Sequence, residues 1–153
     1  MIVHSIVKLI RDKVVAGKTK RSSEWPKVRK AYLKDHPTCA VCDSTKKAEV
    51  HHRKPFHIYP ELELDPKNFI TLCEGKEFGI ICHLISGHLD CFKWENPNVD
   101  SDVKKAVSII SKYNNKATVE CVAELKDYAA ELRARGKADS ELPLPKGKGF
   151  PFQ

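Results

Sequence analysis

The chain has 153 residues, about the size of one domain, and its hydrophobic content of 41% suffices for a modest core. No stretch approaches the ~20 apolar residues of a membrane helix, and the first residues lack the pattern of a secretory leader. We therefore expect a cytoplasmic protein without a membrane partner. The formal net charge of +7 favours a polyanionic partner such as a nucleic acid.

The positive charge is concentrated near the N-terminus. Residues 1–35 carry ten Lys or Arg and three Asp or Glu, whereas residues 36–99 carry seven and nine, and residues 100–153 carry ten and eight. Within this arm, Lys18, Lys20 and Arg21 belong to a polar stretch that predicts an exposed loop. We expect these three side chains to contact nucleic-acid phosphates. The alternative is a solvated basic surface.

Apolar residues at helical spacing predict one helix over residues 2–14 and a second over residues 23–36, which ends before Pro37. The segment that follows is rich in Pro, His and Cys. It predicts strands over residues 50–54 and 69–72, separated by a long proline-containing loop, and a helix that begins near Cys82 or His83.

Two further helices are predicted over residues 103–113 and 118–135, with Gly136 as the end of the last one. The remaining residues, 137–153, are rich in Pro and Gly and predict a loosely held tail. The expected organisation is therefore an N-terminal helix and basic arm (1–21), a core (22–99), a C-terminal helical extension (100–136) and the tail (137–153).

Six cysteines in a cytoplasmic protein point to metal binding more than to disulfides. Cys39 and Cys42 form a Cys-x2-Cys pair, and Cys73 and Cys82 follow on the far side of the predicted strands. Four thiolates around one ion make a closed structural zinc site. We expect these four to bind Zn²⁺; the alternative is a set of buried cysteines without a ligand.

His51 and His52 lie between the two halves of this cysteine framework. Adjacent residues of a strand point to opposite faces, so the two imidazoles do not readily share one ion. One can bind a metal while the other faces a substrate. A purely structural role for the pair is the alternative.

Together these residues resemble the HNH nuclease family, also called ββα-metal or His-Me finger nucleases. The three letters fall on His52, Asn68 and His83, and the resemblance covers about residues 22–99. It rests on the cysteine pairs, Val-His-His at 50–52, Leu-Cys at 72–73, Cys-His at 82–83, Trp25 with the following helix, and Pro-Glu-Leu-Glu-Leu at 60–64. The ending from Cys82 to His88 is similar to a subgroup of small bacterial and phage proteins, which implies a bacterial cell or a phage-infected host.

The resemblance implies an α+β fold, with a ββα-metal core and a structural zinc knuckle flanked by N-terminal and C-terminal helices. It implies a metal-dependent endonuclease that cuts or nicks DNA. His52 would be the general base, Asn68 would hold the loop beside it, and His51 and His83 would bind a catalytic divalent ion: Mg²⁺, Mn²⁺, Ni²⁺ or Zn²⁺. Cleavage in this family leaves a 5′-phosphate and a 3′-hydroxyl.

Two further histidines are candidate ligands of that ion. His88 lies five residues after His83, which is about 140° around a regular α-helix, so it reaches the same ion only if the helix ends or bends at Gly87. His57 lies in the loop between the strands and faces either DNA or the ion. For both residues, packing or a phosphate contact is the alternative.

Arg53 and Lys54 follow the histidine pair and are further candidate contacts to DNA phosphates, with solvated surface as the alternative. The competing function is a zinc-stapled nucleic-acid-binding protein without hydrolytic activity. The sequence leaves open whether the C-terminal helices serve a protein partner, a homodimer or only the core.

Overall fold

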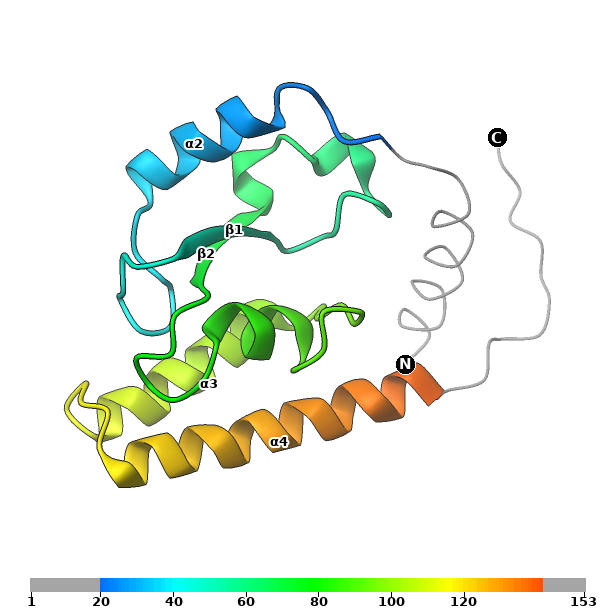
Figure 1. Cartoon of the computed structure of the whole chain (residues 1–153). Coiled ribbons are helices and arrows are strands. Elements are labelled where there is room, and N and C mark those ends of the chain that lie inside the picture. The colour runs from blue at the N-terminus through cyan, green and yellow to red at the C-terminus, as the bar shows by residue number, and fades with distance from the viewer. Residues whose placement is uncertain (1–19, 142–153) are drawn as a thin grey trace.

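The computed structural model describes residues 20–141, which form a small α+β fold (Figure 1). The predicted helix over residues 2–14 and residues 142–153 of the predicted tail lie outside this range. The elements in chain order are α2 (Trp25–Asp35), β1 (Ala48–His52), the 3-10 turns η1 (Pro60–Leu62) and η2 (Pro66–Asn68), β2 (Phe69–Cys73), the π-helical turn η3 (His83–Gly87), α3 (Val99–Lys112) and α4 (Val119–Glu141).

The two strands form an antiparallel hairpin whose register runs from Ala48 opposite Cys73 to His52 opposite Phe69. Every residue of β2 is buried, because helices cover both faces of the hairpin. α2 lies over one face, and η3, α3 and α4 lie over the other (Figure 1). His51 and His52 therefore face different layers, as the alternation of strand residues predicts.

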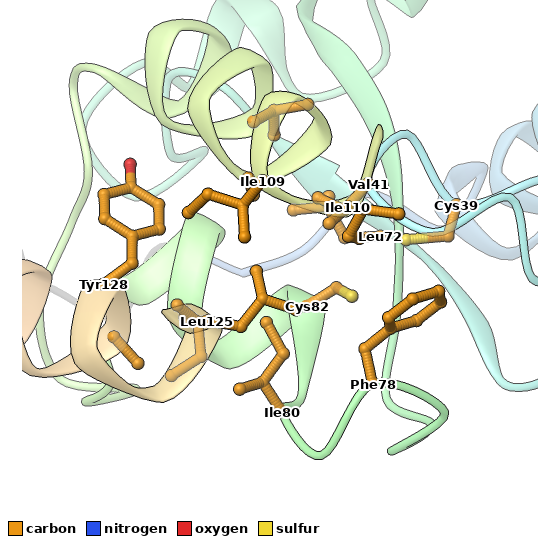
Figure 2. Close-up of a cluster of buried hydrophobic side chains, with 14 of the residues drawn as sticks. Cys39, Val41, Leu72, Phe78, Ile80, Cys82, Ile109, Ile110, Leu125 and Tyr128 are labelled. Carbon is orange, nitrogen blue, oxygen red and sulfur yellow. The ribbon is translucent and has the colours of Figure 1, made fainter. Parts of the chain in front are cut away.

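The core has two parts, one on each side of the hairpin. The smaller part consists of Trp25, Val50 and Phe69, with half-buried residues of α2 around it. The larger part joins β2 to η3, α3 and α4, and Figure 2 shows some of its side chains. It includes Leu72, Leu125 and Leu132, each at most 2% exposed. Burying a side chain of this size contributes about 1.5–3 kcal/mol, so this part supplies most of the hydrophobic stabilisation.

A buried polar network attaches the segment after η3 to the C-terminal helices. The carboxylate of Asp102 accepts hydrogen bonds from Asn96, Tyr128 and Arg135. Asn96 in turn donates to the main-chain carbonyl of Ser86, inside η3. A buried carboxylate needs such partners to offset its lost hydration, and here those partners also fix η3 against α3 and α4.

The last helix is longer than predicted. We expected Gly136 to end it, but α4 continues to Glu141. A Cβ atom at Gly136 would lie 2.4 Å from Cε3 of Trp94. The glycine therefore serves the close approach of the Trp94 ring to the helix, and does not mark a helix end.

The other predicted elements are present with shifted boundaries. β1 covers residues 48–52 and not 50–54, because the main-chain groups of Lys54 bond to the Asn68 side chain and leave the ladder. The helix expected near Cys82 is the short π-helical turn η3. Among residues 20–141, no helix combines the length and apolar composition needed to cross a membrane.

Candidate metal centres

The structure brings the four predicted cysteines together. Cys39 and Cys42 follow α2, Cys73 ends β2 and Cys82 directly precedes η3. Their sulfur atoms all lie within 4.8 Å of one another, and Sγ of Cys42 is 3.5 Å from Sγ of Cys73. Three of the four are buried and Cys42 is half-buried, so this site is closed to solvent on most sides, as structural zinc sites are.

The first cysteine pair lies on a tight knuckle. Asp43 has a φ of 56°, and its amide donates to the carbonyl of Cys39 at 3.0 Å. The amide of Ala40 donates to the carbonyl of Thr71 at 2.9 Å, which attaches the knuckle to β2. These backbone bonds place Cys39 and Cys42 beside the end of the strand that carries Cys73.

The long separation between Cys73 and Cys82 does not prevent their meeting. The intervening segment is anchored by Phe78 and Ile80, which are buried in the larger core beside Cys82 (Figure 2). Its start is fixed where the amide of Glu74 donates to the carbonyl of Lys47. The segment is therefore a loop with apolar anchors, and it returns Cys82 to the cluster.

The electrostatics of the cysteine cluster favour a bound cation. Hydrogen bonds from the other three thiols lower the pKa of Cys39, whereas the pKa values of Cys42 and Cys82 are raised, first by the bond to Cys39. The pKa of Cys73 is lowered as well, so without a cation the four thiols differ in how readily they lose their protons. Zinc holds all four as thiolates, and the donor set and closed geometry of this site fit that ion.

A second cluster consists of three imidazoles: His51 from β1, His83 from η3, and His88 at its end. One ring nitrogen of each lies within 4.8 Å of the others. Nδ1 of His51 is 3.3 Å from Nε2 of His83, and the rings of His83 and His88 have centroids 5.1 Å apart. His88 reaches the cluster because the backbone that precedes it is not a regular α-helix.

η3 is π-helical from His83 to Gly87 and ends at His88, whose φ of −131° is no longer helical. A π-helix closes hydrogen bonds between residues five apart, so its turn is wider than that of an α-helix. The wider turn, and its end at Gly87, bring His88 closer to His83 around the axis than the ~140° of a regular α-helix. Such turns occur often at functional sites.

Gly87 makes room for the second cluster. A Cβ atom there would lie 2.9 Å from Nδ1 of His51 and 3.2 Å from Cδ2 of His83. Any larger residue would meet both rings. The glycine is therefore required by side-chain packing at the cluster, since no left-handed backbone conformation is involved at this position.

The environment keeps the three imidazoles neutral, which is the form that binds metal. Burial is the first cause of the lowered pKa of each ring, and the pKa of His51 falls well below its ordinary value because His88 and His83 also repel its proton. Nδ1 of His88 donates to the carbonyl of Trp94 at 2.9 Å. This bond leaves Nε2 of His88 as the metal-binding atom and fixes the ring.

Nδ1 of His83 lacks a hydrogen bond of the kind that Nδ1 of His88 makes. Oε1 of Glu74 lies 3.4 Å from its Nδ1, but without hydrogen-bond geometry, so that buried nitrogen has no bonded partner. Its Nε2 points toward His51. A metal ion between the three rings would use this inner nitrogen and leave Nδ1 for the carboxylate, an arrangement common around metal-binding histidines.

His52 occupies an aromatic pocket on the other face of β1. Its ring centroid lies 4.6 Å from that of Trp25, 5.0 Å from that of Phe69 and 6.3 Å from that of Phe56. Nε2 of His52 is 2.8 Å from the main-chain oxygen of Glu63. Since a carbonyl only accepts, Nε2 carries the proton and the neutral ring has its lone pair at Nδ1. Burial lowers the pKa of His52, and the hydrogen bond to Glu63 partly opposes this.

Asn68 holds the loop between the strands at two points. Its Oδ1 accepts from the amide of Lys54 at 2.8 Å, and its Nδ2 donates to the carbonyls of Lys54 and Leu62, at 2.8 and 3.2 Å. Leu62 directly precedes the residue whose carbonyl holds His52. The side chain thus joins the start of the loop to η1, beside the imidazole.

The remaining predicted site residues within the described range lie outside the two clusters. His57 lies outside the histidine cluster, with Nε2 2.6 Å from Oε1 of Glu95. The guanidinium of Arg53 pairs with Asp100 at 2.9 Å, and Nζ of Lys54 lies 5.5 Å from the Tyr59 ring centre. Lys20 is exposed, and Lys18 lies outside the described residues.

Arg21 differs from its predicted neighbours in the arm, since it contacts Trp25, Phe56 and Glu63. The sequence did not single out Glu63, Gly87 or Trp94 as site residues. Glu63 and Trp94 contact the imidazoles through main-chain oxygens, which the residue type does not reveal, and Gly87 acts by lacking a side chain. The Gly-His pair at 87–88 was the one signal available.

Comparisons of the chain with protein-family models, with characterised proteins and with solved structures gave no match.

Proposed function

We propose that this protein is a metal-dependent endonuclease of the HNH type, which hydrolyses phosphodiester bonds in DNA. The proposal rests on the different environments of two adjacent histidines, His51 and His52. His51 belongs to a three-imidazole cluster suited to a divalent ion, while His52 is an oriented neutral imidazole with a free lone pair. The proposed place of the substrate phosphate is the end of β1, where these two residues are adjacent in the chain.

In this mechanism Nδ1 of His52 takes a proton from the attacking water. The bond from Nε2 to the Glu63 carbonyl keeps the ring aimed and stabilises the positive charge that the ring acquires. Asn68 prevents the loop that supplies this carbonyl from moving. His51, His83 and His88 would hold the divalent ion, which when bound stabilises negative charge on the phosphate and the leaving oxygen. The expected products are a 5′-phosphate and a 3′-hydroxyl.

Charge supports DNA as the substrate. The chain carries a net charge of +7, with the excess near the N-terminus, and Lys20 begins the described part of that arm as an exposed residue. Phosphate contacts by such lysines position a duplex without reading its sequence. We therefore propose weak sequence preference in binding, with Lys18 and Lys20 on the duplex.

The last part of the proposal is a structural zinc ion bound by the four cysteines beside the hairpin. The thiol cluster joins the segment after α2, the end of β2 and the start of η3. β1, which pairs with β2, carries His51 and His52, η3 carries His83, and Asn68 directly precedes β2. Structural zinc would therefore hold the catalytic groups in place without entering the reaction.

The test is cleavage of supercoiled plasmid by the full chain, purified without chelator, in the presence of Mg²⁺, Mn²⁺, Ni²⁺ or Zn²⁺. We expect nicked or linear product with at least one of these ions, and none with EDTA. His52→Ala should abolish cleavage, while the control His36→Ala, an exposed histidine stacked on Tyr32, should cleave normally. Tight binding of DNA without cleavage under any metal would support the competing function, a zinc-stapled DNA-binding protein.

A further inference from the structure

The guanidinium of Arg21 is held by three side chains, although 40% of the Arg21 side chain is exposed. Its guanidinium carbon is 4.6 Å from the ring centre of Trp25 and 4.2 Å from that of Phe56, so the group is held between two aromatic rings. Nε of Arg21 is 3.5 Å from Oε1 of Glu63. Guanidinium groups stack on aromatic faces and pair with carboxylates in this way when they have a structural task.

Both of these aromatic rings also flank His52. The Trp25 ring lies 4.6 Å from the imidazole and is tilted by 35°, and the Phe56 ring lies 6.3 Å away. Phe56 belongs to the loop between the strands, and Trp25 opens α2. Arg21 therefore links the start of α2 to the loop between the strands.

Glu63 connects Arg21 to the imidazole through one residue. Its side chain is 8% exposed. The amide of Ser22 donates to both carboxylate oxygens, at 3.3 and 3.1 Å, and the carboxylate also pairs with Arg21. Its main-chain carbonyl accepts from Nε2 of His52. Whatever fixes the Glu63 side chain therefore also fixes the oxygen that orients His52.

We propose that Arg21 and Glu63 are positioning residues for His52: the Arg21–Glu63 pair holds the Glu63 carbonyl, and the carbonyl holds the imidazole with its Nδ1 lone pair toward the reacting water. The role in catalysis rests on the proposed nuclease function, whereas the orientation of the imidazole does not. Arg21 thus acts on the catalytic step and not on phosphate binding. Lys20, its exposed neighbour, shares none of these three contacts and serves as the matched control.

The orientation is tested by NMR on the full-length zinc-loaded chain labelled with ¹⁵N histidine, with His52 assigned from the spectrum of His52→Ala. The wild type should show the neutral tautomer that is protonated at Nε2. Arg21→Ala and Glu63→Gln should shift the His52 signals toward a mixture of tautomers. Lys20→Ala and Glu61→Gln, the latter an exposed residue of the same loop, should leave them unchanged. Unaltered His52 signals in both Arg21→Ala and Glu63→Gln would overturn the proposal.

The catalytic role is tested by steady-state cleavage with the same variants. We expect kcat to fall about 10- to 100-fold for Arg21→Ala and Glu63→Gln, because small misplacements of a catalytic group have effects of this size. KM and the salt dependence of DNA binding should not change, and Arg21→Lys should recover part of kcat. A raised KM with unchanged kcat and a salt slope reduced by ~0.9 would identify Arg21 as a phosphate contact and overturn the proposal.

The two measurements separate the two proposals. If the wild-type chain cleaves nothing, the nuclease assignment fails, while the NMR result still decides whether Arg21 and Glu63 orient His52. If Arg21→Ala fails to fold, as shown by circular dichroism, Arg21→Lys and Glu63→Gln carry the test, since both keep the volume of the side chain nearly constant.

Discussion

His88 lies five positions after His83 in the chain. The centroids of their rings are nevertheless 5.1 Å apart, because a π-helical turn connects the two residues. An α-helix would place them about 140° apart. The turn is attached to the rest of the fold where the carbonyl of Ser86 accepts a hydrogen bond from the side chain of Asn96. The histidine cluster therefore depends on packing around η3 as much as on its own ligands.

Gly87→Ala should weaken metal binding at the histidine cluster. The added Cβ would lie 2.9 Å from Nδ1 of His51 and displace that ring. We expect the affinity for Ni²⁺, measured by calorimetry, to fall about 10- to 100-fold, the range seen when groups that orient ligands are altered. Zinc content of the cysteine cluster should stay at one ion per chain. The control Gly75→Ala meets only the flexible Glu77 carboxylate and should bind Ni²⁺ normally.

Cys39→Ser should destabilise the whole described domain. Zinc binding and folding are coupled, and this change removes one of four buried ligands. We expect loss of the ion by metal analysis and a large drop in the thermal midpoint. Cys91→Ser, outside the cluster, should retain zinc and melt near the wild type. Wild-type protein that contains no zinc after purification without chelator would count against the site.

Gly136→Ala should destabilise the protein although alanine favours helices. The intrinsic gain in helix propensity is about 1 kcal/mol. Against it stands a Cβ atom 2.4 Å from the Trp94 ring, and overpacking of this kind costs about 1–3 kcal/mol. A net loss of stability is expected in urea unfolding. A more stable variant would show that Trp94 moves away without cost.

Replacing Lys18 and Lys20 by Ala should weaken DNA binding to a similar degree across sequences. The log–log salt slope should decrease by up to ~1.8, at ~0.9 for each lost phosphate contact. Lys104→Ala with Lys126→Ala lowers the net charge equally from α3 and α4 and should leave more of the slope intact. Equal slopes for the two double variants would mean that the arm has no special place on the duplex.

The sequence predicted those parts of the site that depend on residue type. Cysteine spacing was enough for the thiol cluster, and alternation along β1 was enough to assign His51 and His52 to different faces. It offered His88 as a ligand only on the condition that the helix ends or bends at Gly87, and the structure meets that condition, since η3 ends there. It was misleading at Gly136, where a glycine that normally ends a helix accommodates Trp94.

The contacts of Arg21 could not be predicted from the sequence. As part of Lys-Thr-Lys-Arg it was expected to contact phosphates, which no contact within the structure tests. Its partners in the structure are Trp25, Phe56 and Glu63, the last two far along the chain, and such long-range contacts leave no local pattern. For Asn68 the resemblance implied a loop-holding task, and its side chain bonds to Lys54 and Leu62 of that loop.

Paired calorimetry and cleavage measurements on His51→Ala and His52→Ala test whether these adjacent histidines divide metal binding from proton transfer. His51→Ala should lose affinity for the divalent ion by at least tenfold, about 1.4 kcal/mol, together with cleavage. His52→Ala should bind the ion within about twofold of the wild type and still show no cleavage. Loss of the ion in His52→Ala as severe as in His51→Ala, or full cleavage by His52→Ala, would show that the two residues do not divide these tasks.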